Sequence, residues 1–362
     1  MILVGLDPAT LVFQHTDRQQ AIKHARLLRE LASVVPYGAW LRLLVSSQMR
    51  RRLIAEGKFP THAAVQTTLQ STALQNVYSV NDIVRQLNTL TSLADIETAV
   101  GIHDVLWEQL EIVPDMNFPA NEVLADELRR VLSILTVAGT KSDTEFELGV
   151  ATFECCERFE STVRVVALEP ENLDGFHPDQ LPRDVTCKLL KFISLESTLE
   201  RLDPSRVWAV AKTSVLVALA IILKMIELMK AAGTYRGLSS IPEFLVGAGF
   251  LHSLQTCGAT GEGPRSSVVL DKVASVLCST GNVDIRELRT SAKRNSSQVV
   301  RHDGATAWRV HVTKGHEALR FMFWRRKDGR PELANVANKH DVHIIDGDAC
   351  GLVCSKRLYQ TP

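Results

Sequence analysis

Residues 141–176 read KSDTEFELGVATFECCERFESTVRVVALEPENLDGF, and this stretch decides the predicted fold. Apolar residues recur at helical spacing over 144–159, and Asp143 precedes two glutamates as a helix cap with first-turn acids does, so we expect a helix there. The run VRVVAL at 163–168 is short, β-branched and apolar, which predicts a strand buried on both faces of a parallel sheet. Glu169 follows that strand, at the carboxyl end where open α/β sheets place their sites.

The residues before this stretch alternate between strand and helix patterns. An apolar strand is predicted over 2–6 and ends at Asp7, and a second strand is predicted over 40–45. Helices are predicted over 46–57 and 119–137 from apolar spacing and a terminal glycine or proline. This alternation favours an α/β fold in which helices cover a parallel sheet.

Composition indicates a globular protein with unequal charge along the chain. The 362 residues are 45% hydrophobic and carry no formal net charge. However, residues 95–160 hold fifteen acidic and four basic side chains, whereas 291–330 hold ten basic and three acidic ones. We therefore expect a cation-tolerant pocket in the first region and an anionic partner for the second.

The cysteines and the apolar runs predict a cytoplasmic protein without a membrane partner. Seven cysteines are spread along the chain, and the start MILVGLD lacks the basic region of a signal peptide, so we expect reduced thiols. The most apolar run, 214–222, is shorter than the ~20 residues that span a bilayer. It predicts a buried helix.

The second half of the chain changes from helical to β-rich. Helical spacing dominates 185–228 and continues into short helices predicted over 265–278 and 283–295. Period-two patterns and turn residues predict strands at 307–313, 318–325 and 332–336, with a fourth at 343–345. The predicted domains are an α/β domain over 1–183, a helical middle domain over 184–296 and a small, basic, β-rich domain over 297–362.

The order of acidic residues in the first half resembles that of the PIN-domain family of metal-dependent ribonucleases. In that family an aspartate ends the first strand, as Asp7 does in VGLDPAT. A second acid lies in the helix after the second strand, in a pattern that LLVSSQMRRRLIAEG resembles. A third begins a segment similar to SDTEFELGVATF, at Asp143, and a fourth follows the next strand, as Glu169 does in VVALE. The resemblance covers about residues 1–180.

The resemblance implies hydrolysis of RNA by water activated on Mg²⁺ or Mn²⁺. The implied metal ligands are Asp7, Asp143 and Glu169. Arg51 or Arg52 stands where the family has its second acid, and a guanidinium there would repel a metal. Glu56, one turn further along, can supply the missing ligand, as can an acid from elsewhere: Glu97, Asp104 or Glu108. Otherwise the site is degenerate, and the domain binds nucleic acid or assembles with a protein.

A histidine and cysteine cluster near the C-terminus has residue types that suit tetrahedral zinc. It consists of His340, His343, Cys350 and Cys354. The spacing is unfavourable, because residues three apart on a strand point to opposite faces and the six-residue connection is shorter than a usual finger loop. We therefore expect an ordinary reduced tail rather than a zinc site.

Basic and aromatic side chains alternate over 301–330. The candidate nucleic-acid ligands are Arg309, Lys314, Arg320, Arg325 and Arg326. Phe321 and Phe323 share a strand face, so we expect them in the core rather than stacked on bases. The run from WRVHV to DVHI, over 308–344, also resembles the β-sheet of RelE-type messenger-RNA-cleaving toxins, which implies contact with RNA or a ribosome.

These patterns favour a metal-dependent endoribonuclease of toxin or defence-effector type. Its substrate would be RNA or another nucleic acid, and its C-terminal domain would contact nucleic acid or a protein partner such as an antitoxin. The alternative is a catalytically degenerate PIN-like module that binds nucleic acid or assembles with protein.

Overall fold

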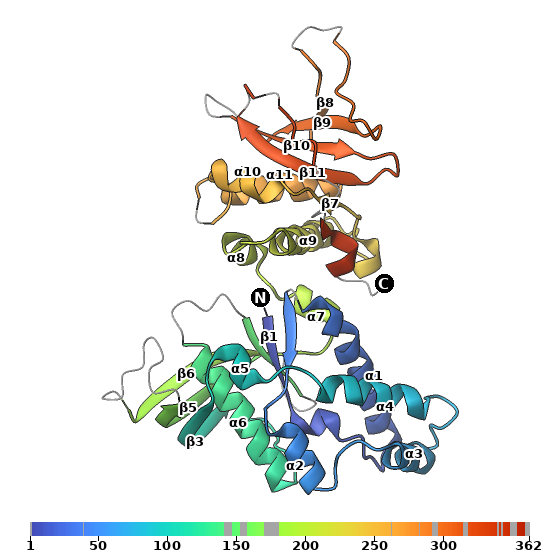
Figure 1. Ribbon diagram of the computed structural model, residues 1–362, viewed down its shortest axis with the longest axis vertical. Helices are drawn as coiled ribbons and strands as arrows, with labels where there is room; N and C mark the ends of the chain where they lie inside the picture. The colour runs from blue at the N-terminus through green and yellow to red at the C-terminus, as the bar shows by residue number, and fades with distance from the viewer. Residues whose placement is uncertain are drawn as a thin grey trace. The chain divides into compact units, whose positions relative to one another are not determined.

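The computed structural model contains two compact units, Met1–Ser197 and Thr198–Pro362. It describes residues 2–38, 40–140, 147–152, 158–169, 181–261, 263–281, 283–291, 296–313, 318–338, 340–341, 343–347 and 353–358, with only the backbone of residues 37, 104 and 169. Figure 1 labels the elements of both units. The helices after residue 200 and the strands of the predicted C-terminal domain lie in the second unit. Residues 185–191, which were predicted as helical, instead form part of a strand of the first unit, so that part of the prediction is wrong.

The first unit is built on a mixed six-stranded sheet in the order β2-β1-β4-β6-β5-β3. Its strands are β1 (Ile2–Leu6), β2 (Leu41–Leu44), β3 (Asp104–Val113), β4 (Glu147–Ala151), β5 (Arg158–Glu169) and β6 (Arg183–Lys191). β1 pairs in parallel with β2 and β4, and β4 pairs in parallel with β6, whereas β5 runs antiparallel to both β6 and β3. All five residues of β1 are buried, as expected for a strand covered on both faces.

Helices surround this sheet. They are α1 (Arg18–Val34), α2 (Met49–Ala55), α3 (His62–Ser71), α4 (Val80–Thr91), α5 (Ile96–Val100) and α6 (Glu122–Ala138), with 3-10 turns η1 (Pro8–Leu11) and η2 (Val35–Tyr37). Asn121 caps α6 by accepting a hydrogen bond from the backbone N–H of Leu124 at 3.0 Å. A Cβ on Gly5 would come within 2.6 Å of Val131 Cγ1, so the glycine lets α6 lie directly against β1.

The described residues of the stretch that opened the sequence analysis, 147–152 and 158–169, are almost entirely β-strand, so the helix predicted over 144–159 is wrong there. β4 occupies its middle, with four buried residues in a row. A short strand buried on both faces loses the period-two signal, and a few apolar residues then match helical spacing by chance. The strand predicted at 163–168 exists within β5, but it is antiparallel. Its buried side chains alternate with half-buried or exposed ones, so the expectation of burial on both faces is also wrong.

The second unit contains another six-stranded sheet, largely antiparallel, in the order β12-β7-β11-β10-β9-β8. Its strands are β7 (Leu245–Val246), β8 (Ile285–Glu287), β9 (Thr306–His311), β10 (Leu319–Arg325), β11 (Pro331–Asn338) and β12 (Val353–Cys354). β9, β10 and β11 confirm three predicted strands. β8 lies where a helix over 283–295 was predicted, and residues 343–345 form no strand, so both of those predictions are wrong.

The helices of the second unit form layers below this sheet. They are α8 (Pro204–Ala209), α9 (Ser214–Ala231), α10 (Phe250–Thr256) and α11 (Ser266–Leu277), with 3-10 turns η4 (Leu238–Ser240) and η5 (Ser355–Leu358), and α7 (Leu195–Leu199) lies where the two units divide. Figure 1 shows α10 and α11 between the sheet and the layer of α8 and α9. α9 confirms the predicted buried helix over 214–222, and none of the described helices has the length and apolarity needed to span a membrane.

Candidate functional site

Asp7 lies at the carboxyl end of β1, where the sequence predicts it. Its Oδ1 accepts a hydrogen bond from the backbone N–H of Ala9 at 2.8 Å and so caps η1. Its Oδ2 accepts one from the hydroxyl of Thr152, just beyond β4, at 2.7 Å. The side chain is only 3% exposed, so the protein itself holds both carboxylate oxygens.

The described residues do not bring the other predicted metal ligands to Asp7. Asp143 lies outside them, and of Glu169 only the backbone is described. Glu169 was expected at the carboxyl end of the parallel strands. Because β5 runs antiparallel to β6, Glu169 instead lies near the start of β6. Glu56 ends α2 and accepts a hydrogen bond from Asn121 Nδ2 at 2.8 Å. No three His, Cys, Asp or Glu side chains of the described residues are placed to share a metal.

Arginines neutralise two buried acids beyond the carboxyl end of β2. Arg52, one of the two arginines that stand where the sequence resemblance leads us to expect an acid, has its Nε 2.6 Å from Glu127 Oε2. Glu127 lies in α6 and is fully buried. Glu97 accepts a hydrogen bond from the backbone N–H of Ser47 at 2.9 Å and lies 3.2 Å from Arg130 Nη2. These ion pairs join α2, α5 and α6 and leave the acids little capacity to coordinate a cation.

Sequence reasoning missed Glu127 as the partner of Arg52. The available signal was its position in α6, three residues after Leu124 on a face that is otherwise apolar. A charged residue on a buried helix face requires a partner of opposite charge, and Arg52 was the unexplained cation. The pairing depends on how α2 meets α6, which a sequence pattern does not give.

The second candidate site is a group of basic side chains on the second sheet, which we call the arginine face. It comprises Arg286 on β8, Arg309 and His311 on β9, and Arg320 on β10. Arg309 pairs across the sheet with Arg286, and His311 pairs with Arg320, so all four point to the same side of the sheet.

Two of these arginines have no compensating charge among the described residues. Neither Arg309 nor Arg320 forms an ion pair there, and the Nε atom of each is buried without a hydrogen-bond partner. Arg286, by contrast, lies 2.6 Å from Asp284. Unpaired guanidinium groups on adjacent strands leave a local positive charge that an anion can neutralise.

Burial and neighbouring positive charges lower the pKa values of two groups in the arginine face. Burial, followed by the charge of Arg309, lowers the pKa of Arg320. Burial also lowers the pKa of His311, with smaller effects in the same direction from Arg320, Arg309 and Arg286. These shifts have the direction expected where cations crowd one another.

The remaining predicted nucleic-acid ligands lie elsewhere. Arg325 is on the opposite side of β10, with its guanidinium carbon 4.5 Å from the centre of the Trp308 ring. Arg326 Nη1 lies 3.0 Å from Glu332 Oε2, a buried carboxylate, and Lys314 is outside the described residues. The predicted nucleic-acid ligands that are described therefore do not share one surface. Only Arg309 and Arg320 among them lie on the same side of the sheet.

The predicted core role of two aromatic residues is confirmed. Phe321 and Phe323 are 0% and 2% exposed, and their rings stack with centres 5.4 Å apart. Phe321 also meets Phe250 of α10 at 6.0 Å. They are thus unavailable to stack on bases.

Three residues of the C-terminal histidine and cysteine cluster are described, and they do not form a group that could share a metal. His340 and His343 are exposed, and Cys354 lies on β12, where its thiol donates to Glu243 Oε1 at 3.2 Å. Cys350 lies outside the described residues.

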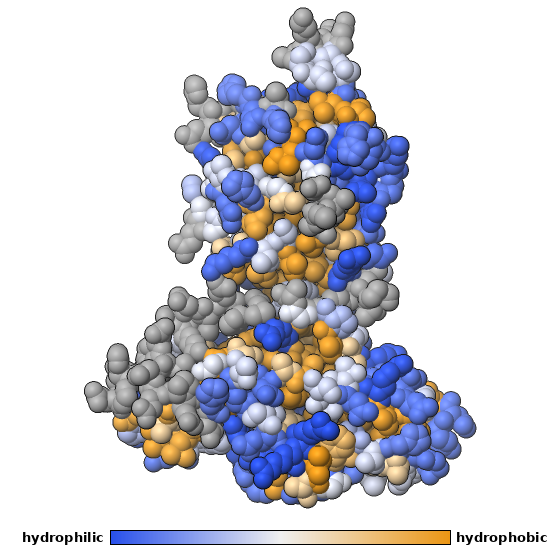
Figure 2. Space-filling view, in the orientation of Figure 1, coloured by the Kyte–Doolittle hydropathy of each residue, from blue (hydrophilic) through white to orange (hydrophobic). Residues whose placement is uncertain are grey.

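Comparison with known proteins adds no assignment. No family model, curated protein or solved structure matches this chain. The fold itself is that of an α/β protein, with helices around a mixed six-stranded sheet in the first half and a second, largely antiparallel six-stranded sheet in the other. In Figure 2 hydrophilic residues cover much of the visible surface, with apolar residues between them over the helices of the second unit.

Proposed function

We propose that this protein binds RNA through the phosphates, using the arginine face of its second unit. The observation that carries the proposal is the pair Arg309 and Arg320, which lie on adjacent strands without an acidic partner among the described residues. A phosphate would supply the missing negative charge, and a guanidinium can donate two hydrogen bonds to it.

The proposed contacts are to the backbone of the nucleic acid rather than to its bases. Phe321 and Phe323 face the core, so the neighbouring aromatics give no stacking platform. Binding through phosphates alone is electrostatic, tolerant of sequence and strongly dependent on salt.

In this proposal the first unit is a catalytically degenerate PIN-like module. Arg51 or Arg52 stands where the resemblance leads us to expect an acid, and Arg52 pairs with Glu127. Both oxygens of Asp7 accept hydrogen bonds, one from Ala9 and one from Thr152. These interactions support a structural role for the carboxyl edge of the sheet. The resemblance to PIN ribonucleases remains a prediction.

The binding proposal is tested with a fluorescently labelled single-stranded RNA and fluorescence anisotropy. The test variant is Arg309→Gln with Arg320→Gln, and the control is Arg325→Gln with Lys327→Gln, which removes the same charge from two exposed positions of the same unit. The test variant should bind at least about tenfold more weakly than wild type, as expected for the loss of two charge-assisted contacts. Equal weakening in both double variants would show that net charge, and not the arginine face, determines binding.

A second candidate function is metal-dependent cleavage of RNA by the first unit. The observation that favours it is the position of Asp7, which Thr152 orients at the carboxyl end of adjacent parallel strands. The test compares RNA cleavage in Mn²⁺ by wild type, Asp7→Asn and Asp143→Asn. Metal-dependent cleavage that both substitutions abolish would support this candidate over the degenerate module, and cleavage that survives both, or is absent from wild type, would reject it.

A further inference from the structure

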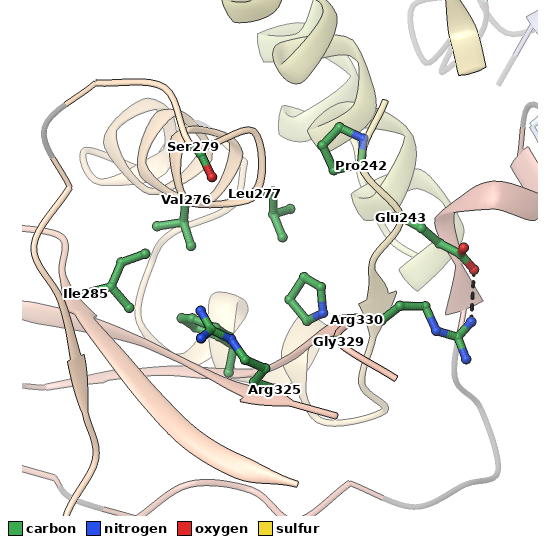
Figure 3. Close-up of a pocket in the computed structure, with 11 residues that line it drawn as sticks. Pro242, Glu243, Val276, Leu277, Ser279, Ile285, Arg325, Gly329 and Arg330 are labelled. Atoms are coloured by element: carbon green, nitrogen blue, oxygen red, sulfur yellow. Dashed lines mark hydrogen bonds and ion pairs between the residues drawn. The ribbon is translucent and has the colours of Figure 1, made fainter. Parts of the chain in front are cut away.

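A second binding site is suggested by a pocket on the opposite side of the same sheet from the arginine face. The pocket has a volume of about 390 Å³ and lies between the end of α11 and the strands β8 and β10. Figure 3 shows Val276, Leu277 and Ser279 on one side, Ile285 at one end, and Arg325 facing them from below. This volume is at the lower end of the ~300–1,000 Å³ range of small-molecule sites.

Apolar side chains line one part of the pocket wall. They include Val276 and Leu277 of α11, Ile285 of β8, Phe323 of β10 and Pro331 of β11. Water makes few hydrogen bonds with apolar side chains, whereas a bound apolar group of matching size removes their surface from water, which is favourable. This part of the wall therefore favours a ligand with an apolar body, while the rest of the lining is polar.

Arg325 supplies the polar end of the pocket. Its guanidinium carbon lies 4.5 Å from the centre of the Trp308 ring, which holds the planar group in place from one side. It forms no ion pair with an acid among the described residues. The other arginine at the rim, Arg330, is already 2.9 Å from Glu243, a pair that Figure 3 marks with a dashed line.

We infer that this pocket binds a small organic acid with an apolar body and a single carboxylate. The carboxylate would accept hydrogen bonds from Arg325, and the body would lie against Leu277, Ile285 and Phe323. A neutral ligand of the same shape would cover the guanidinium without neutralising its positive charge, which is less favourable than an ionic contact. The site is separate from the arginine face, because Arg325 and Arg320 point to opposite sides of β10.

The test measures the binding of 2-naphthoate and of its neutral analogue 2-naphthamide by isothermal titration calorimetry on the full chain. Wild type should bind 2-naphthoate saturably and 2-naphthamide at least about tenfold more weakly, as one charge-assisted contact predicts. Arg325→Gln should weaken 2-naphthoate about tenfold and remove the difference between the two ligands. Arg289→Gln, which removes an equal charge from a residue that lines neither the pocket nor the arginine face, should bind as wild type does.

A further variant protects the test against misfolding of Arg325→Gln. Ser279 lines the pocket with φ of 54°, a backbone conformation that aspartate tolerates. Ser279→Asp places a negative charge at the rim and should weaken 2-naphthoate but not 2-naphthamide. Absence of saturable 2-naphthoate binding, or equal affinity in wild type, Arg325→Gln and Ser279→Asp, would overturn the inference.

Discussion

Removal of Arg320 should stabilise the protein, which is an unusual expectation for a half-buried side chain. Arg320 and Arg309 are diagonal neighbours on paired strands, a relation that puts side-chain origins roughly 7 Å apart. At that distance two unit charges repel by about 0.6 kcal/mol in water and about 2.4 kcal/mol at an effective dielectric constant of 20. Arg320→Met retains the apolar stem and removes the charge, so we expect the free energy of unfolding to rise by about 0.5–1 kcal/mol after screening.

A matched substitution at Arg326 should have the opposite effect. Arg326 Nη1 lies 3.0 Å from the buried carboxylate of Glu332, so Arg326→Met removes a favourable ion pair. Its expected cost is about 1.5 kcal/mol or more, the usual contribution of a hydrogen bond to a charged group. Both variants lose one positive charge. If the free energy of unfolding rises in one variant and falls in the other, the difference must come from the groups around each arginine.

The assay is urea unfolding of wild type and both variants at low and at high salt. The gain from Arg320→Met should shrink in high salt, because the Debye length falls to about 3 Å at 1 M. A loss of stability in Arg320→Met like that in Arg326→Met, or an equal rise in stability at both salt concentrations, would refute this prediction. Either result would show that Arg320 and Arg309 do not repel each other appreciably.

Three further predictions concern stability. Glu332→Gln should destabilise the second unit by about 3 kcal/mol in urea unfolding, because Glu332 is 2% exposed and its Oε1 lies 2.7 Å from the buried guanidinium of Arg301. Burial lowers the pKa of His24 to about 3, so the unfolded chain takes up a proton near pH 6.5 that the folded protein does not. Stability should therefore fall with pH below 6.5, by about 1.4 kcal/mol at pH 5.5 from this residue, and His24→Gln should remove that part of the pH dependence. Gly5→Val should lower the melting temperature strongly, since even a Cβ would come within 2.6 Å of Val131 Cγ1, and an unchanged melting temperature would contradict the close contact of α6 with β1.

The sequence predicted elements whose signals are local. The strand before Asp7, helix α6 and the strands β9 to β11 follow directly from apolar periodicity and turn residues. The core position of Phe321 and Phe323 follows from the two-residue period of a strand. These features need no knowledge of which elements meet in space.

The sequence failed where the answer depends on strand neighbours. The residues of β4 suit a central strand. That they form a strand rather than a helix depends on their place between β1 and β6, and no local sequence pattern reveals that place. The direction of β5 is set by its pairing with β6, and this direction removes Glu169 from the edge where Asp7 lies.

The separation of the basic residues follows from the same period-two rule. Arg320 and Arg325 differ by an odd number of positions, so they take opposite faces of β10, a consequence that was open to sequence reasoning once the strand was predicted. The partners of Arg326 and Arg52 required the tertiary structure, since Glu332 and Glu127 come from other elements.

The salt dependence of RNA binding tests the central claim most directly. The affinity of wild type and of the Arg309→Gln, Arg320→Gln double variant for a single-stranded RNA is measured over a range of salt concentrations. Each lost phosphate contact should reduce the slope of log K against log salt by about 0.7, so the double variant should lose about 1.4. Identical slopes and affinities in wild type and double variant would contradict the proposal that the arginine face binds RNA.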